Sequence, residues 1–263
     1  MTRVVTDGAV DLPAAAGVTV VRGPVRLDGE AWDGDLARFW AELGKRAQLP
    51  ATEAPAVDQL AAAYAGTDPV LAVHVSGELS RTVAHARRAA AASACPVQVV
   101  DSRSLSVGAG LLVMAAREAV DAGVHGERLT RMVDAWVGQL HVHALIDDVG
   151  LLVRGGRAGL VAAGLSRHAH RQVVAVKGHA IPIREVRHRA EGIRELIEHV
   201  REHADGGVTR WAVGHGDAAD RGEFVERVAG LFGCEPSYVT LLGAPVGAHM
   251  GPRSLVLGFL SAG

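Results

Sequence analysis

A histidine near the end of the chain lies in a segment made almost entirely of small residues. His249 stands in VGAHMGP (246–252), surrounded by two glycines, an alanine and a proline. Because Gly and Pro disfavour the interior of a helix, we expect a loop here that contributes little to the core. Glycines also let a backbone approach a ligand closely. The segment therefore predicts a position where an imidazole, which changes charge near neutral pH, could meet a ligand.

Ser76, Thr52 and Arg157 are further candidates, and each also has a structural interpretation. Ser76, in VHVSGE, stands where a strand leads into a helix, so its hydroxyl could join an anion site or cap the helix. Thr52, in ATEAPA, precedes another helix and could also be a cap. Arg157, in RGGRAG, suits a carboxylate or phosphate, but a solvated turn accounts for it equally well.

Two histidine pairs raise the hypothesis of a metal site. HVH contains His141 and His143, and HAH contains His168 and His170. Alternation along a strand places each pair on one face. No pattern of cysteines and carboxylates completes a familiar metal site, so we predict no bound metal.

Asp7, Ser76 and His249 are also the residue types of a hydrolase triad. However, the HVSGE sequence around Ser76 is not the G-x-S-x-G nucleophile elbow. A Ser/His hydrolase acting on an acyl ester is therefore an alternative and not the first hypothesis.

The composition narrows the class of protein. The chain has 263 residues, of which 49% are hydrophobic and only 4% aromatic, so the core must consist largely of Ala, Val and Leu. A formal net charge of -2 gives no electrostatic reason to expect nucleic acid or an anionic membrane as a partner. The apolar stretch GAGLLVMAA is too short for an integral membrane segment. Two cysteines without metal spacing favour a cytoplasmic location.

Strands alternate with helices over roughly the first 130 residues, which predicts a parallel α/β sheet. TRVVTDG, PVLAVHVSG and PVQVVDS are typical of buried strands, and each ends in a polar turn. In open parallel sheets, ligands bind at that carboxyl edge. The second half contains five strand-like segments and two helical segments, which predicts an α+β domain. We expect an N-terminal α/β domain over 1–135 and a C-terminal α+β domain over 136–263.

Seven segments, in the correct order, resemble the motifs of the DegV family of bacterial fatty-acid-binding proteins. They span the chain from end to end: TDGAVDLP (6–13), VTVVRGPVRLDGEAW (18–32), TEAPA (52–56), VSGELSRT (75–82), VVDSRSLSVGAGLLV (99–113), LLVRGGRAG (151–159) and VGAHMGP (246–252). This resemblance implies two domains with a long-chain fatty acid buried between them, and no cofactor.

The resemblance also implies a role for individual residues. The residues that would meet the fatty-acid carboxylate are Thr52, Ser76 or its neighbour Gly77, Arg157 and His249. Arg187 is similar to a family arginine thought to serve a partner, a separate ATP-dependent fatty acid kinase. The chain would then have no turnover of its own and would present the carboxylate for acyl-phosphate formation.

The chain departs from the family pattern at three positions near the expected carboxylate. Glu53 replaces a serine, Gly77 replaces the second serine of I-S-S, and Arg81 replaces a glycine. A glutamate beside Thr52 would repel a carboxylate if it pointed inward. A binding module for another amphipathic small molecule is therefore a further alternative.

Overall fold

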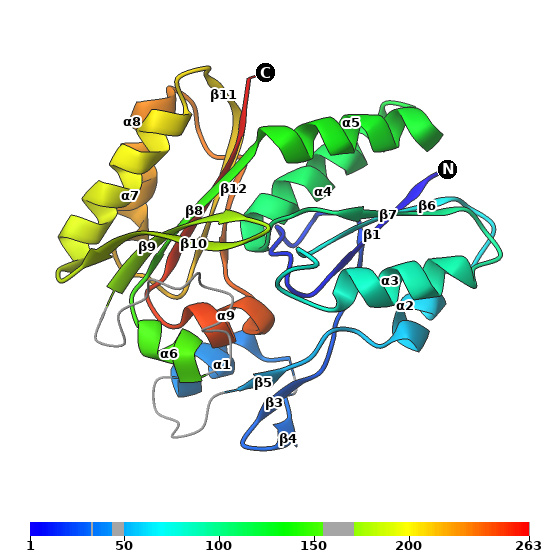
Figure 1. Cartoon of the computed structure of the whole chain (residues 1–263), viewed down its shortest axis with the longest axis horizontal. Helices are drawn as coiled ribbons and strands as arrows, with labels where there is room; N and C mark the ends of the chain where they lie inside the picture. Colours follow the sequence, from blue (N-terminus) through cyan, green and yellow to red (C-terminus); the bar gives the residue numbers. More distant parts are fainter. Residues whose placement is uncertain (33, 44–49, 155–170, 263) are drawn as a thin grey trace.

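The computed structural model describes residues 1–32, 34–43, 50–154 and 171–262 (Figure 1). Arg157, His168 and His170 lie outside the described residues. Within the described part of the chain, no helix is both long and apolar enough to cross a membrane.

The first of two large sheets is four-stranded, with all neighbouring strands parallel, in the order β2-β1-β6-β7. Because side chains alternate across a strand, Val4 and Leu71 contribute to the core on one face, whereas Val5 and Ala72 contribute to the core on the other. The prediction of a parallel sheet in the first half is confirmed. Its strands are β1 (Arg3–Asp7), β2 (Thr19–Val21), β6 (Val70–His74) and β7 (Val97–Asp101).

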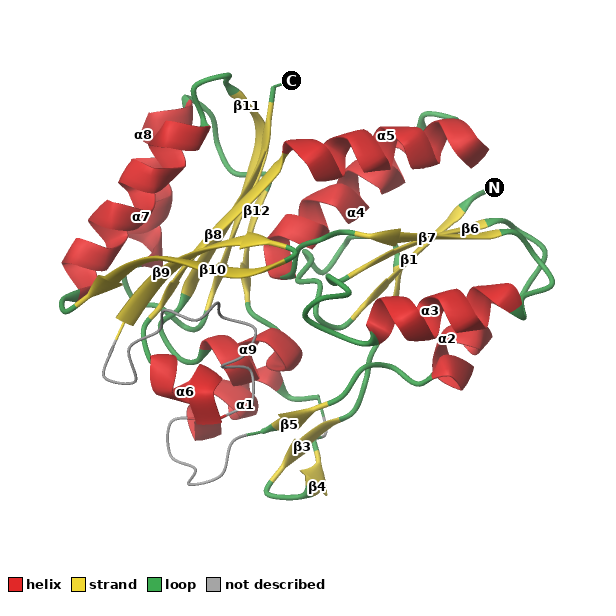
Figure 2. Cartoon of the chain, in the orientation of Figure 1, coloured by secondary structure: helices red, strands yellow, loops and turns green. Residues whose placement is uncertain are grey.

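Helices cover both faces of this sheet (Figure 2). The helices α2 (Val57–Tyr64) and α3 (Thr82–Ala91) pack on one face. The other face is covered by α4 (Ser106–Asp121) and α5 (Gly126–Gln139). Burial on both sides explains why β6 is an uninterrupted apolar run up to His74.

The second sheet has six strands in the order β10-β9-β8-β13-β11-β12. All neighbours are antiparallel except β11 and β12, so the sheet is mixed and the expected α+β character is confirmed. The helices α7 (Arg189–His203) and α8 (Arg221–Phe232) cover its outer face. The strands are β8 (Leu140–Ile146), β9 (Arg171–Lys177), β10 (His179–Val186), β11 (Val208–His215), β12 (Tyr238–Leu241) and β13 (Leu255–Ser261).

The helix α4 lies between the two sheets and belongs to the cores of both. Leu112 packs with the strands of the first sheet, and Leu111 packs with Val142 of the second. A Cβ on Gly108 would overlap the side chain of Val142, so glycine allows this close approach. The domain boundary that we predict between residues 135 and 136 falls within α5 and stays a prediction.

The expectation of a loop around His249 is wrong, because α9 (Ala244–Met250) is a short helix. Pro245 stands in its first turn, where a missing N–H costs nothing. Gly247 faces the ring of Trp40, which a Cβ would overlap, and Gly251 ends the helix with φ +78°. The segment is also part of the core, since its side chains before and after His249 are buried.

A small sheet and two short helices complete the described fold around α9 (Figure 1). Trp40 and Phe39 form an edge-to-face pair with ring centroids 5.3 Å apart, and the Trp40 indole N–H donates to the carbonyl of Leu242. Both rings pack against Gly247 of α9. The elements are β3 (Val25–Leu27), β4 (Glu30–Ala31), β5 (Ala51–Thr52), α1 (Leu36–Leu43) and α6 (Val149–Arg154).

Candidate functional site

A cavity of about 140 Å³ lies between the second sheet and the carboxyl edge of the first. One part of its apolar wall comes from β8, β9, β10 and β13, because these strands turn alternate small and branched side chains inward, and the rest comes from loops of the first half of the chain and from α9. Its polar residues come from the first half of the chain and from α9. The apolar lining residues on the sheet are Ala144, Ile146, Val174, Val176, Ala180 and Val256; the polar lining residues are Asp7, Thr52, Glu53, Ser80, Thr82 and His249.

Thr52 and His249 meet at the wall of this cavity. Thr52 lies on β5 and His249 in the last turn of α9, and the Thr52 Oγ1 is 2.8 Å from the His249 Nε2. Both side chains are half-buried, so they contact the cavity without being sealed from it. A hydroxyl and an imidazole in contact form a compact donor and acceptor pair for one polar group of a ligand.

Two further hydroxyls, which the sequence analysis did not assign to the site, line the cavity at the start of α3. The Ser80 Oγ lies 2.8 Å from the Thr82 Oγ1 and accepts a hydrogen bond from the Thr82 backbone N–H. Both residues follow the end of β6 by a few positions, and ligands bind at that edge of a parallel sheet, so their position in the sequence is a signal that could have identified them.

Asp7 lines the cavity but pairs with His74 and not with His249. The Nδ1 of His74 is 3.0 Å from the Asp7 Oδ2, and the His74 Nε2 is 2.9 Å from the Tyr64 hydroxyl. Because a carboxylate accepts, Nδ1 donates to Asp7, and Nε2 shares the second hydrogen bond with the Tyr64 hydroxyl. All three side chains are fully or almost fully buried. The chain of hydrogen bonds fixes the end of β1 against β6.

Ser76 links the two halves of the molecule, whereas Gly77 is bonded within the first half. The Ser76 hydroxyl is buried and donates to the carbonyl of Gly178, 2.5 Å away in the β9–β10 turn. The Gly77 N–H donates to the carboxylate of Asp101, with 3.2 Å to each oxygen. Among the described residues, those lining the cavity include neither Ser76 nor Gly77. Their role as carboxylate ligands stays a prediction.

Arg187 is exposed just beyond β10 and does not line the cavity. Its carbonyl accepts a hydrogen bond from Arg171 at 2.9 Å. The register of β10, β9 and β8 places it about two strand spacings, roughly 10 Å, from the cavity residue Ile146.

Asp11 connects the elements that carry the site. Its Oδ2 accepts from the Ser106 hydroxyl at 2.6 Å, at the start of α4, and its Oδ1 accepts from the Gly243 N–H at 2.7 Å, just before α9. Burial raises the pKa of Asp11 to about 6, although these two hydrogen bonds oppose the shift. This carboxyl, in the loop after β1, thus links the start of α4 to the start of α9.

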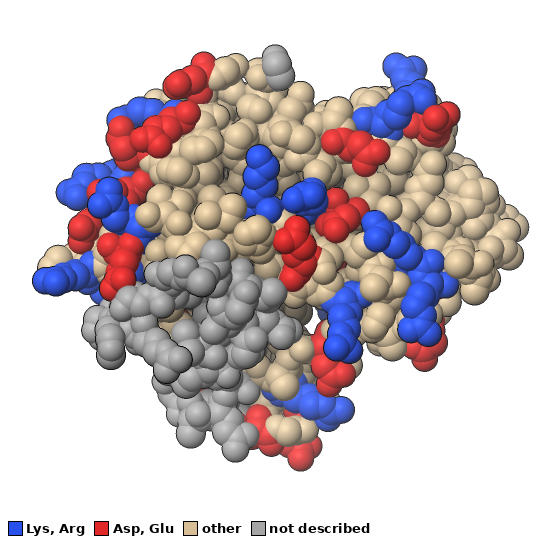
Figure 3. All heavy atoms as spheres, viewed as in Figure 1, with Lys and Arg blue, Asp and Glu red and all other residues tan. Residues whose placement is uncertain are grey.

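The charges outside the cavity are mixed in sign. Figure 3 shows acidic and basic side chains interspersed over the face that is viewed. At the cavity itself, Glu53 is exposed beside Thr52 and also contributes to the lining. Its carboxylate lies at the solvent-facing edge, where water screens it.

Comparisons with known proteins give a consistent result. A family model described as an uncharacterised protein of the DegV family matches residues 1–262. A DegV domain-containing protein of Streptomyces coelicolor is 30% identical over 271 residues, which cover 96% of this chain and 95% of that protein.

Solved structures agree with this match. One described as showing fatty acid binding of a DegV family protein from Thermus thermophilus is 26% identical, with a TM-score of 0.85 over 99% of both chains. A stearic acid-binding protein from Eubacterium ventriosum shares the fold, with 20% identity and a TM-score of 0.89 over 99% of this chain and 98% of that one.

Proposed function

The chain belongs to the DegV family, and on that premise we propose that it binds a long-chain fatty acid in the cavity between its two sheets. The observation that carries the proposal is the Thr52–His249 hydrogen bond at the wall of a largely apolar cavity. An aliphatic chain fits the wall of Val, Ile and Ala, and a carboxylate fits the hydroxyl and imidazole. The fatty-acid binding described for the Thermus thermophilus relative supports the proposal.

The acyl chain supplies most of the affinity in this proposal. Burying one methylene is worth about 0.8 kcal/mol, so a sixteen-carbon acid gains roughly 11 kcal/mol before costs. The loss of translational and rotational freedom on binding offsets several kcal/mol of this gain. A single hydrogen bond contributes only about 0.5–3 kcal/mol net. The polar residues therefore mainly fix the orientation of the ligand.

Thr52 and His249 are the central carboxylate ligands that we propose, and the Ser80 and Thr82 hydroxyls lie on the same cavity. Ser76 has one hydroxyl proton, which it donates to Gly178. To bind the ligand, the Ser76 hydroxyl would stop donating to the Gly178 carbonyl and would donate to the ligand carboxylate, which is a stronger acceptor.

We propose that a separate ATP-dependent kinase phosphorylates the bound acid. The sequence carries no P-loop or glycine-rich phosphate motif, so this chain would act as the cytoplasmic lipid-binding subunit and not as an enzyme. Arg187 is the residue that we propose for contact with the kinase, since it is exposed and does not line the cavity.

The alternative of a Ser/His hydrolase has no support from the geometry. The Ser76 hydroxyl donates to Gly178, and Asp7 pairs with His74, so Asp7, Ser76 and His249 do not form the hydrogen-bonded chain of a triad. The imidazole of His249 contacts a threonine instead.

Native mass spectrometry followed by lipid extraction tests the proposal. Protein purified from a bacterial host is expected to carry about one fatty acid per chain. After delipidation it should bind palmitic or stearic acid again, and it should not hydrolyse acyl esters. A delipidated, folded protein that binds none of myristic, palmitic and stearic acids would overturn the proposal.

A further inference from the structure

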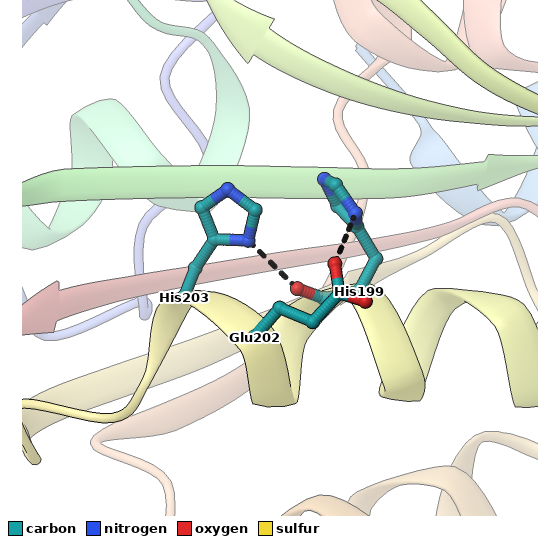
Figure 4. Close-up of side chains that lie close together, drawn as sticks. All are labelled: His199, Glu202 and His203. Atoms are coloured by element: carbon teal, nitrogen blue, oxygen red, sulfur yellow. Dashed lines mark hydrogen bonds and ion pairs between the residues drawn. The ribbon is translucent and has the colours of Figure 1, made fainter.

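Three side chains that can ligate a metal lie together near the end of α7, away from the cavity. They are His199, Glu202 and His203, and one ligand atom of each lies within 4.8 Å of the other two (Figure 4). Residues three and four apart are neighbours on the surface of a helix, which explains the grouping. Among the residues that the structure describes, no second group of this kind occurs.

The polar contacts of the two helical histidines both involve Nδ1, so Nε2 of each ring is the nitrogen that a metal ion could take. The Nδ1 of His203 donates to the backbone carbonyl of His199 at 2.8 Å, so the Nε2 of the neutral ring carries the lone pair. Metal-bound histidines are held in this way, with the second nitrogen donating to a carbonyl or carboxylate. The His199 Nδ1 lies 3.4 Å from a carboxylate oxygen of Glu202.

A further histidine, on strand β8, contacts the two histidines of α7. His143, on β8, is only 2% exposed, and neither of its ring nitrogens has a hydrogen-bond partner. Its ring centroid lies 4.9 Å from that of His199 and 5.3 Å from that of His203. Buried polar groups are nearly always hydrogen-bonded, so a buried imidazole without a partner requires an explanation.

We propose that His143, His199 and His203 form a binding site for a divalent transition-metal ion of the zinc type, with Glu202 as a fourth ligand. Imidazole nitrogens suit Zn²⁺, Ni²⁺ and Cu²⁺, whereas Mg²⁺ and Ca²⁺ require oxygen ligands. The helical part of the site reads H-x-x-E-H (199–203), with two histidines one turn apart, a spacing that zinc peptidases use for metal ligands.

The geometry requires a small closure around the ion. Zinc–nitrogen bonds of about 2.0–2.1 Å place tetrahedral ligand atoms about 3.3 Å apart, closer than the 4.8 Å limit found here. His203 is exposed and His199 half-buried, so side-chain rotation can bring them toward the fixed ring of His143.

The site lies on the opposite side of the second sheet from the cavity. Along β8, Val142 and Ala144 face the core beside the cavity, whereas His141 and His143 face α7. A metal ion coordinated from both elements would therefore link α7 to β8 and would not contact the fatty acid that we propose for the cavity. The prediction of no metal rests on the HVH and HAH pairs and on the lack of a familiar ligand pattern, and spacing does not reveal His199 and His203, which stand more than fifty residues beyond His143.

Zinc titration of the untagged, chelator-treated chain tests this site. Competition with a chromophoric chelator should show one zinc ion bound per chain. His203→Gln changes an exposed side chain and should weaken zinc binding at least tenfold, and His199→Gln should do the same. His188→Gln, an exposed histidine at the start of the same helix, is the matched control and should leave binding unchanged.

The buried ligand is tested without a substitution that could unfold the protein. In NMR spectra that correlate imidazole nitrogens with ring protons, zinc should shift a ring nitrogen of His143 and raise the melting temperature. Absence of zinc binding would overturn the proposal. Binding that is unchanged in both His203→Gln and His199→Gln, or that leaves the His143 nitrogens unshifted, would overturn it as well.

Discussion

Thr52 and His249 are 197 positions apart in the chain, yet their side chains share a hydrogen bond of 2.8 Å. The bond joins β5, in the small sheet, to α9, which rests on the aromatic pair of α1. A ligand group that replaces or extends this bond is therefore held by elements from both ends of the chain.

Loss of the imidazole should weaken the binding of a fatty acid more than the binding of the matching alcohol. His249→Ala is expected to weaken palmitic acid binding by roughly tenfold to a hundredfold, since one hydrogen bond to a carboxylate is worth about 0.5–3 kcal/mol. Hexadecanol should bind the wild type less well and lose less on substitution. Competition titrations measure both, with His188→Ala as the control. Equal losses for acid and alcohol would mean that His249 only shapes the cavity.

Glu53 lies exposed at the cavity beside Thr52, so its charge should oppose a carboxylate ligand. Glu53→Gln is expected to tighten fatty-acid binding by about twofold to fivefold at low ionic strength, a small effect because solvent screens exposed charges. Titrations at low and high salt measure it, and the gain should shrink as salt rises. An unchanged or salt-independent affinity would show that the Glu53 carboxylate does not face the ligand.

Arg187 should matter for the partner and not for the lipid. Arg187→Ala is expected to leave the affinity for palmitic acid unchanged within about twofold and to reduce kinase-dependent acyl-phosphate formation at least tenfold. Arg184→Ala, an exposed arginine on the same strand, is the matched control. Equal loss of lipid binding and of coupling in Arg187→Ala would show that the assignment is wrong.

Asp11 should make the protein less stable as pH rises. Its pKa is raised from 3.8 to about 6 in the folded state, so folding favours the protonated form. The contribution is fully present below about pH 3.8 and is lost as pH rises through 6, an effect on the order of 3 kcal/mol. Asp11→Asn keeps the shape without the charge. Urea unfolding from pH 4 to pH 7 should show the wild type losing stability relative to the variant, and parallel profiles would contradict the shift.

Gly247 should tolerate no side chain. A Cβ there would overlap the Trp40 ring, so Gly247→Ala is expected to destabilise the protein by about 1–3 kcal/mol and to displace His249. Gly222→Ala, in a helix position with open space, is the control and should be neutral or slightly stabilising. Thermal unfolding and palmitic acid titration measure both effects. Wild-type stability in Gly247→Ala would show that α9 does not rest on Trp40.

The sequence predicts the two sheets well because their strands are long apolar or alternating runs between polar turns. The sequence analysis predicts no element between residues 124 and 137, although Leu129, Val133 and Trp136 of α5 follow helical spacing. The helix around His249 could not be predicted from propensity, since the packing of Gly247 on Trp40 selects it.

The candidate site was predicted through resemblance and not through spacing. No local pattern shows that Thr52 meets His249, or that His143 meets His199, because the fold brings these residues together from distant segments. The sequence also leaves open whether Glu53 points into the cavity or toward solvent, because the residue type does not decide its orientation. The structure shows that Glu53 is exposed.

The burial of α4 between the two sheets determines how quickly a bound molecule can be exchanged. Because Leu111 and Leu112 belong to different cores, spreading the sheets apart would pull α4 out of one core or the other and expose buried leucine surface to water. A hinge between the halves is thus too costly for routine release. The dissociation rate should follow local opening of α9 and β5 instead, so amide protons there should exchange with solvent long before those of α4.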